Sequence, residues 1–493
     1  MPPKPGSGRR RPRDAGFTAR MGWRRRPVRS ERLRTPAPVF KTRMPSKRGA
    51  MEQPNARQDG EGLLTPVFWL VLGLTGVAAG LSGVVLMSLL FHVEAAAFPG
   101  SGSYLANVAD ASGIRRVNSL LIAGMLGGIA IYLLRRYTPG EKTDLDDIVW
   151  TASGELSFRR CLGTAVISEV VVGMGASLGR EAATKLMGGA FGSVLGGRFG
   201  LTAEQRRLLI ACGGGAGLAC VYNVPLGGAF FTAEILLGTT SLTTLLPALA
   251  CSALATMTAW IYLPNRATYL DVPAYPFSAS LLCWALLAGP VIGLLATGYI
   301  RVIGWISHHR VPGAGVLLAP IAAFGVLGLI GLRYPQLFGN GHGLAAPAFL
   351  GLGSAGLMLT LALLKPLVTA LCLGSGVSGG LFTPVLSSGA AFGAGTGILW
   401  TQLWPGSPVG AFAMVAAAAA IGSSMQAPLT GLALVLELTH GGFAILVAMI
   451  AATVAATVVV RRLDGYSIYS ARLPARTHTT ATTTPTEPPG LAS

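Results

Sequence analysis

Residues 173–200 read GMGASLGREAATKLMGGAFGSVLGGRFG, and this stretch is the most informative part of the chain. It is apolar and rich in glycine, and it holds one carboxylate, Glu181, directly after Arg180. An ionisable side chain at membrane depth costs at least ~2.5 kcal/mol on insertion scales, so it is retained where it faces protein, water or a transported ion. Glu181 is therefore the first candidate for a functional residue.

The composition of the whole chain indicates a membrane protein. Of its 493 residues, 51% are hydrophobic and 12% are charged, whereas soluble domains carry roughly 25% charged residues. Apolar runs recur between residues 64 and 460. Several reach the roughly 20 residues that cross a bilayer, and others are short or interrupted by glycine. We therefore predict an all-α polytopic membrane protein with broken helices.

The positive charges are concentrated near the N-terminus. Residues 1–60 hold 17 Lys or Arg against four acidic residues, and this segment has too little apolar content to fold. We expect a basic disordered cytoplasmic tail there, solvated and not bound to nucleic acid, and a short disordered tail at 474–493. The positive-inside rule then places Arg135 and Arg136 in the cytoplasm as well. The prediction is a multi-pass protein of the cell membrane, in contact with lipid, with both termini cytoplasmic.

An internal repeat organises the membrane region. Residues 224–234 (VPLGGAFFTAE) recur as residues 427–437 (APLTGLALVLE), with the proline and the final glutamate in register at an offset of 203. Gly179 has a counterpart in Gly380 at an offset of 201. The offsets predict two membrane halves, 61–263 and 264–473. Repeated halves with interrupted helices are typical of transporters whose substrate binds at the midplane between them.

The two interrupted segments favour an anion as the substrate. Residues 173–183 and 374–384 each lead from small residues into a helix, whose first N–H groups lack partners and attract anions. A cation site would need inward carboxylates or rings of carbonyls, and these segments have no acidic cluster. The histidines lack metal-ligand spacing, and no nucleophile stands beside a base. We therefore expect no metal, no cofactor and no enzymatic activity.

The motifs resemble those of the CLC family of chloride channels and chloride/proton exchangers. Residues 179–183 (GREAA) resemble the GREGP motif, and residues 380–384 (GLFTP) match GxFxP. The other motifs, in the family's order, are 223–228 (NVPLGG), 427–431 (APLTG) and 468–471 (IYSA). The resemblance covers residues 64–475. It implies an inverted repeat of two antiparallel helical halves with broken helices at the ion site, and a homodimer with one pore per subunit.

The resemblance also assigns the site. It implies that Glu181 is the gating glutamate, which competes with the transported chloride for the pore and swings aside when protonated. The residues that it places around the anion are Gly140, Glu141, Arg180, Ala182, Gly380, Leu381, Phe382 and Tyr469. For Leu381 and Phe382 the donors would be backbone N–H groups. For Tyr469 the donor would be the hydroxyl, with a purely structural tyrosine as the alternative.

The chain departs from the family pattern in the pore itself. Ungapped counting back from Glu181 puts Gly140 where the family has a pore serine. The missing hydroxyl leaves the choice among chloride, nitrate and fluoride open, with chloride as the default, and backbone, Lys142 or water would supply the coordination. Lys185 stands four residues after Glu181, which is salt-bridge spacing on a helix. Lys185 therefore holds Glu181 charged, snorkels, or pairs with Glu169.

One further position bears on whether the chain conducts or exchanges. Exchangers of the family commonly carry a proton-carrying glutamate directly after the position of Glu234, where this chain has Ile235. Proton movement would then need another route, through Glu234 or Glu169. The sequence accordingly favours channel-like conduction of anions through a glutamate-gated pore. The alternative is proton-coupled exchange of chloride, another halide or nitrate, and an inactive membrane scaffold is the least favoured.

Overall fold

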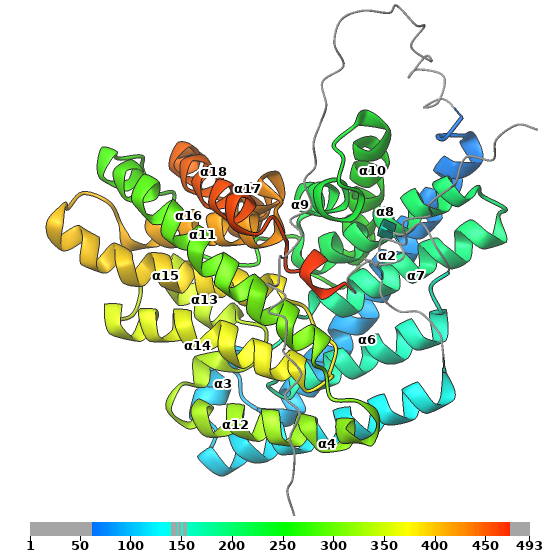
Figure 1. Ribbon diagram of the computed structural model, residues 1–493, viewed down its shortest axis with the longest axis horizontal. Coiled ribbons are helices and arrows are strands. Elements are labelled where there is room, and N and C mark those ends of the chain that lie inside the picture. Colours follow the sequence, from blue (N-terminus) through cyan, green and yellow to red (C-terminus); the bar gives the residue numbers. More distant parts are fainter. Residues whose placement is uncertain (1–61, 140–144, 146–148, 151–154, 474–493) are drawn as a thin grey trace, which may run out of the picture. The chain divides into compact units, whose positions relative to one another are not determined.

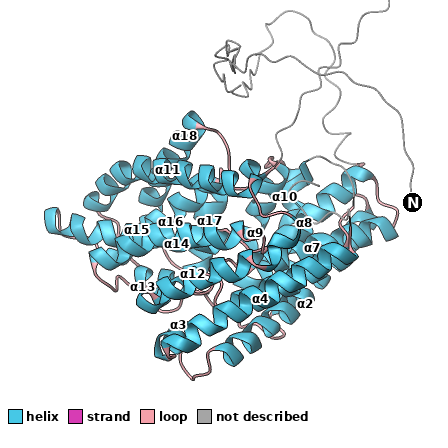
Figure 2. Cartoon of the chain, turned by 60° about the horizontal axis from the view of Figure 1, so that its bottom comes forward, coloured by secondary structure: helices cyan, strands magenta, loops and turns pink. Residues whose placement is uncertain are grey.

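The computed structural model describes residues 62–139, 145, 149–150 and 155–473 (Figure 1). These residues form helices and no β-strand, as Figure 2 shows, so the prediction of an all-α protein is confirmed. The predicted tails at 1–60 and 474–493 lie outside the described residues. The same holds for Gly140, Glu141 and Lys142.

The helices follow one another along the chain with short connections. Their bounds are α2 (Pro66–Ala97), α3 (Tyr104–Asp110), α4 (Gly113–Tyr137), α6 (Phe158–Gly173), α7 (Glu181–Arg198), α8 (Ala203–Tyr222), α9 (Pro225–Phe230), η1 (Phe231–Leu237), α10 (Leu242–Ala259), α11 (Ala279–His308), η2 (Gly313–Leu317), α12 (Ala319–Arg333), η3 (Pro335–Leu337), α13 (His342–Phe349), α14 (Ala355–Gly374), α15 (Phe382–Leu403), α16 (Val409–Met425), α17 (Pro428–Thr439), η4 (Phe443–Ile445), α18 (Leu446–Leu463) and η5 (Ser470–Arg472). The element η1 is a π-helical continuation of α9.

Seven helical segments in the described part of the chain are long and apolar enough to cross a bilayer. They are Pro66–Ala97, Gly113–Tyr137, Leu242–Ala259, Ala279–His308, Gly313–Arg333, Ala355–Gly374 and Phe443–Leu463. Shorter apolar helices lie among them at Pro225–Leu237, Val409–Met425 and Pro428–Thr439. A mixture of full spans and shorter helices is what the interrupted apolar runs predict.

The repeat is visible in the packing of the helices. In the first half α7 packs against α8 and α10 packs against α2, while in the second half α15 packs against α16 and α18 against α11. Figure 1 shows α2, α6, α7 and α8 on one side and α14, α15 and α16 on the other. Between them lie α9 and α17, which contact each other. The two halves therefore meet along their corresponding helices.

Each half turns into its central helix through the same backbone conformation. Asn223 ends α8 with φ 57°, and Gln426 ends α16 with φ 58°. Both are left-handed conformations that few residues other than glycine adopt. The chain then begins α9 at Pro225 and α17 at Pro428, where proline suits the first helical turn. The repeated proline motif is thus a repeated reversal between two helices.

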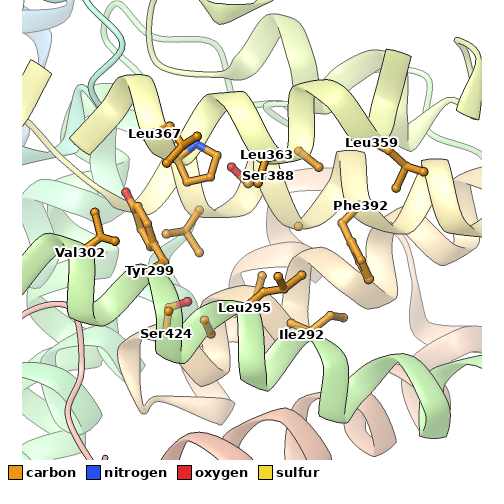
Figure 3. Close-up of a pocket in the computed structure, with 17 residues that line it drawn as sticks. Ile292, Leu295, Tyr299, Val302, Leu359, Leu363, Leu367, Ser388, Phe392 and Ser424 are labelled. Carbon is orange, nitrogen blue, oxygen red and sulfur yellow. The ribbon is translucent and has the colours of Figure 1, made fainter. Parts of the chain in front are cut away.

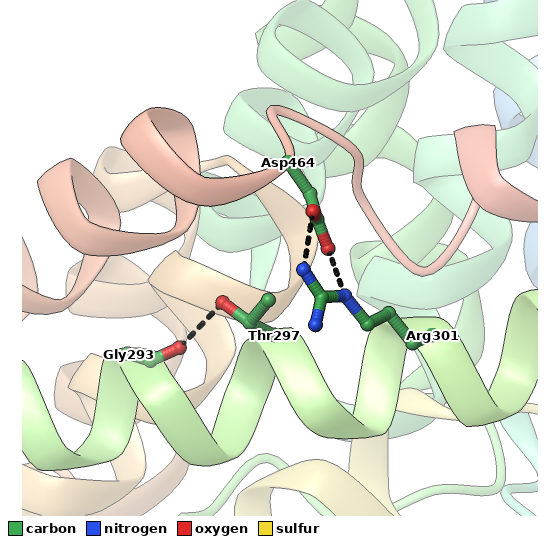
Figure 4. A network of polar contacts seen from close by, with 4 residues as sticks. All are labelled: Gly293, Thr297, Arg301 and Asp464. Atoms are coloured by element: carbon green, nitrogen blue, oxygen red, sulfur yellow. Dashed lines mark hydrogen bonds and ion pairs between the residues drawn. The ribbon is translucent and has the colours of Figure 1, made fainter. Parts of the chain in front are cut away.

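A polar contact ties α11 to the segment that follows α18 (Figure 4). The Arg301 guanidinium donates two hydrogen bonds to the Asp464 carboxylate, at 2.6 and 2.7 Å. One turn earlier the Thr297 hydroxyl donates to the Gly293 carbonyl at 2.8 Å, so it is satisfied within its own helix. The Arg301 side chain is 64% exposed, and we therefore assign this pair to positioning more than to stability. It fixes the beginning of the segment that runs from Asp464 to Tyr469.

Candidate anion and proton site

The two glycine-interrupted loops pair with each other in an antiparallel bridge. Gly179 and Gly380 exchange two backbone hydrogen bonds, each with an N to O distance of 2.8 Å. A Cβ atom on Gly179 would lie 2.3 Å from the Glu181 carboxylate oxygens, and one on Gly380 would lie 2.0 Å from Oε1. Only glycine leaves room for the carboxylate at both positions. This pairing brings the start of α7 beside the start of α15.

The Glu181 carboxylate lies on the first turn of α15. Its Oε1 atom accepts a hydrogen bond from the backbone N of Phe382 at 2.8 Å. Its Oε2 atom accepts from the Thr383 hydroxyl at 3.2 Å and from the Tyr222 hydroxyl at 3.1 Å. Neither α7 nor α15 has a side-chain cap from its own N-cap residue, so the Phe382 N–H at the start of α15 is free of an intrahelical partner and binds the carboxylate as it would bind an anion.

The hydrogen atoms around Oε2 are too few for the contacts that surround it. The Tyr222 and Thr383 oxygens also lie 2.6 Å from each other, so three short oxygen contacts share two hydroxyl hydrogens. With Glu181 ionised, one of the three contacts has no hydrogen. A proton on the carboxyl group supplies the third hydrogen and lets all three contacts be hydrogen bonds. The triangle therefore accommodates both protonation states of Glu181.

A small cavity of about 130 Å³ adjoins Glu181 on one side. Of the residues predicted at the anion, Ala182, Gly380, Leu381 and Tyr469 line it together with Glu181. Phe382 is buried and contributes its backbone N–H, as described above, while its ring packs edge to face on Tyr222 at 5.7 Å. The structure thus gathers these predicted residues around one space.

Three basic residues line the same small cavity and were not among the predicted site residues. They are Lys185, Arg310 and Arg472. The Lys185 ammonium lies 4.7 Å from the centroid of the Tyr469 ring and 5.6 Å from that of Phe231. These are cation–π distances. The sequence marked Lys185 as a partner of Glu181 or Glu169, whereas the Glu181 contacts among the described residues come from Tyr222, Phe382 and Thr383.

A larger cavity of about 580 Å³ adjoins the site on the other side. Arg180, predicted beside the anion, lines this cavity and not the small one, and its guanidinium lies 4.8 Å from the centroid of the Tyr222 ring. Glu94 and His342 also line it. Since Tyr222 lines the large cavity and bonds to Glu181 in the small one, the carboxylate stands where the two cavities approach each other.

The two repeated glutamates cap helices of the opposite half. Glu437 accepts hydrogen bonds from the backbone N atoms of Leu226 and Gly227, at 2.9 and 2.6 Å. Glu234 accepts from the backbone N atoms of Leu429 and Thr430, at 3.2 and 2.7 Å, and from the Thr430 hydroxyl at 2.7 Å. Both oxygens of Glu234 are therefore engaged at the start of α17. This position gives Glu234 a structural role that the sequence did not predict.

Glu169, the other residue considered for proton movement, is in a different situation. It is fully buried in α6, and neither of its carboxylate oxygens has a hydrogen-bond partner among the described residues. The charged groups that act on it are Arg180, Glu181 and Glu94. It can therefore gain or lose a proton without breaking a hydrogen bond.

The described part of the chain contains no group of three His, Cys, Asp or Glu side chains that could hold a metal ion.

Comparison with known proteins identifies the family. A family model described as voltage gated chloride channel matches residues 123–461. The H(+)/Cl(-) exchange transporter ClcA of Cronobacter sakazakii is 30% identical over 431 residues, which cover 82% of this chain and 89% of the relative. The ClcA of Yersinia pseudotuberculosis is 27% identical over 431 residues, or 83% of this chain and 88% of that protein.

Solved structures share the fold. A slow cyanobacterial Cl-/H+ antiporter superposes with a TM-score of 0.72 at 23% identity, covering 82% of this chain and 97% of that one. A CLC-type fluoride/proton antiporter gives a TM-score of 0.66 at 21% identity, with the same coverage. These likenesses confirm the predicted fold class. The family match and the apolar helices together make the chain a multi-pass membrane protein. The chain belongs to the CLC family of voltage gated chloride channels.

Proposed function

We propose that this protein exchanges a small anion, with chloride as the expected substrate, for protons across the membrane. The observation that carries the proposal is the hydrogen bond from the Phe382 N–H, at the start of α15, to the Glu181 carboxylate. We call this carboxylate position on the first turn of α15 the seat. A carboxylate in that seat imitates a bound anion, and protonation removes the charge that holds it there. Glu181 would thus alternate between excluding the anion and carrying a proton.

Ile235 alone would favour channel-like conduction, and we propose proton-coupled exchange in its place. The curated relatives that match most of this chain are named H(+)/Cl(-) exchange transporters, so an apolar residue at this position is a weaker guide than the family as a whole. Ile235 is buried in η1. Proton access from that direction therefore requires another group or water.

We further propose Glu169 as the second proton-binding group, in preference to Glu234. Glu169 is buried, lacks hydrogen-bond partners among the described residues and is coupled electrostatically to Glu181. Glu234 already accepts hydrogen bonds from two backbone N–H groups and a hydroxyl at the start of α17. Hydrogen bonds to charged groups contribute about 1.5–3 kcal/mol, and any movement of the Glu234 side chain away from α17 would give them up.

The anion would enter the small cavity and move to the seat when Glu181 leaves. Lys185, Arg310 and Arg472 give this cavity positive charge, which favours an anion over a cation. Gly380 and Leu381 in its wall and the Tyr469 ring would bound the anion. Gly140 and Glu141 are proposed at the anion on the family resemblance alone. Arg180, in the larger cavity, would attract anions at the other mouth.

The experiment is a flux assay with purified protein in liposomes loaded with chloride. Anion efflux should drive protons uphill in the opposite direction, and nitrate and fluoride in place of chloride would rank the substrates. Glu181→Ala should abolish the uphill proton movement while anion flux persists, because the seat is then open and the proton carrier is missing. Passive anion flux without proton movement in the unaltered protein would instead establish the channel reading. No flux of any tested anion would favour a scaffold.

Two features of the assembly belong to the same proposal. We expect a homodimer with one pore per subunit, which chemical cross-linking in liposomes would test. We also expect both termini on the cytoplasmic side, because residues 1–60 are strongly basic. A cysteine placed in each tail and probed with a membrane-impermeant thiol reagent would locate them. The substrate would pass through unchanged, so the activity is transport and not enzymatic conversion.

A further inference from the structure

We propose that the acyl chain of a membrane lipid occupies a cavity between α11, α14 and α15, distinct from the transport site. The cavity measures about 420 Å³, within the roughly 300–1,000 Å³ typical of ligand pockets. Figure 3 shows side chains from the three helices converging on it. Leu295 comes from α11, Leu363 from α14 and Phe392 from α15, while Ala420 and Ser424 of α16 lie in its wall.

The chemistry of the wall excludes water and ions as the main occupant. Nearly all of its side chains are aliphatic or aromatic, and apolar cavities stay dry because water there finds too few polar partners. The Ser388 hydroxyl is already bonded to the Pro384 carbonyl at 2.7 Å. The Tyr299 hydroxyl is buried without a hydrogen-bond partner among the described residues. This hydroxyl and that of Ser424, which also lines the wall, are too few to hold an ion or a chain of waters.

The mouth of the cavity continues the surface that faces lipid. Leu295 and Leu363 are 53% and 62% exposed, and they stand on α11 and α14, both of which are candidate membrane spans. Acyl chains are therefore the molecules in contact with the mouth. Filling the cavity restores the dispersion contacts that an empty space would lose. A chain entering from the bilayer gains these contacts without having to displace bound water.

The inner wall offers a way to tell a lipid inside the cavity from lipid at the surface. Every residue from Gly410 to Met425 in α16 is buried, so the bilayer reaches Ala420 and Ser424 only through the cavity. The protein should be reconstituted in liposomes containing a phospholipid with a diazirine near the end of one acyl chain. After illumination, mapping of the labelled peptides should place label on Ala420 or Ser424.

A matched pair of glycine variants controls the experiment. A Cβ atom added to Gly298, which lines the cavity on α11, meets nothing within 4 Å, and the same is true of Gly356 near the start of α14, outside the cavity. Gly298→Phe should abolish the label on α16 and spare the label on exposed Leu295, whereas Gly356→Phe should leave both. Ala362→Phe, on the opposite wall, serves if Gly298→Phe fails to fold.

The outcomes decide the proposal. Label confined to exposed residues such as Leu295 and Leu363 in the unaltered protein would overturn it. The cavity would then hold water or be covered by a second copy of the chain. Label on α16 that persists in both Gly298→Phe and Ala362→Phe would overturn it as well, since the chain would be entering elsewhere. Because labelling does not depend on flux, either result is independent of the transport assay.

Discussion

Two pairs of corresponding helix starts meet in this molecule, and only one pair is symmetric. At α9 and α17 each half sends a carboxylate to the other, Glu437 to the first and Glu234 to the second. At α7 and α15, Glu181 reaches α15, but its counterpart at the same offset of 201 is Phe382, so no carboxylate returns. The reciprocal pair fixes the halves together. The one-sided contact leaves a seat that its own carboxylate can vacate.

The one-sided contact should be very sensitive to any added volume in the seat. In Gly380→Ala the new Cβ would lie 2.0 Å from the Glu181 Oε1 atom, within the space that the carboxylate and the anion would share. Overpacking of about 1–3 kcal/mol corresponds to a loss of roughly 5-fold to 150-fold in anion flux. The measurement is chloride efflux from liposomes.

Two companions make that result interpretable. Gly374→Ala, whose Cβ has Ile306 as its nearest neighbour at 3.0 Å, should transport almost normally. The double variant with Glu181→Ala should stay slow, because removing the carboxylate does not remove the methyl group. Normal flux in Gly380→Ala, or its recovery in the double variant, would place the anion elsewhere.

The reciprocal pair should respond in stability and not in coupling. Glu234→Ala and Glu437→Ala each remove a charged acceptor from the start of a helix, and hydrogen bonds to charged groups contribute about 1.5–3 kcal/mol. Both variants should unfold at lower temperature in detergent, followed by tryptophan fluorescence. The fraction of each variant that remains folded should exchange anions for protons in the same ratio as the unaltered protein. A selective loss of proton movement in Glu234→Ala would return this residue to the proton path.

The motifs made one side of this comparison predictable. The repeated offset of Gly179 and Gly380 pointed to two helix starts that converge, because interrupted helices in corresponding places signal a midplane site. Glu181 stood out because a carboxylate in an apolar stretch needs a reason to be there. These features are local in the sequence. The interrupted apolar runs are also local features, and they were enough to predict the all-helical fold class.

The remaining features depend on packing between distant segments. Tyr222 and Thr383 meet at Glu181 although 161 residues separate them, and a single hydroxyl in an apolar run has no spacing that marks it. Arg310 and Arg472 come to the small cavity from different elements. The glutamate that ends each repeat was visible, but the helix that it caps belongs to the opposite half. Only the three-dimensional arrangement could assign Glu234 to that contact.

The hydroxyl triangle gives a smaller and more specific effect. Tyr222→Phe removes one hydroxyl that donates to the Glu181 carboxylate, so the carboxylate should be held less firmly on α15 and should leave the seat more often. Anion efflux at fixed pH should therefore rise roughly fivefold, since one hydrogen bond contributes about 1 kcal/mol net. Tyr104→Phe is the matched control, since the Tyr104 hydroxyl has no hydrogen-bond partner in the described residues. Slower efflux from Tyr222→Phe would contradict the donor role of Tyr222.

The two caps of the reciprocal pair differ by one hydrogen bond. Glu234 has three donors, of which the Thr430 hydroxyl is one, whereas Glu437 has two backbone donors, because the position matching Thr430 is Gly227. Thr430→Val should therefore lower the free energy of unfolding by about 1 kcal/mol, the net value of one hydrogen bond. In that background Glu234→Ala should cost less than it does alone, since one of the contacts is already gone. Additive losses would mean that the hydroxyl stabilises something other than the Glu234 carboxylate, and the two caps would then be equivalent after all.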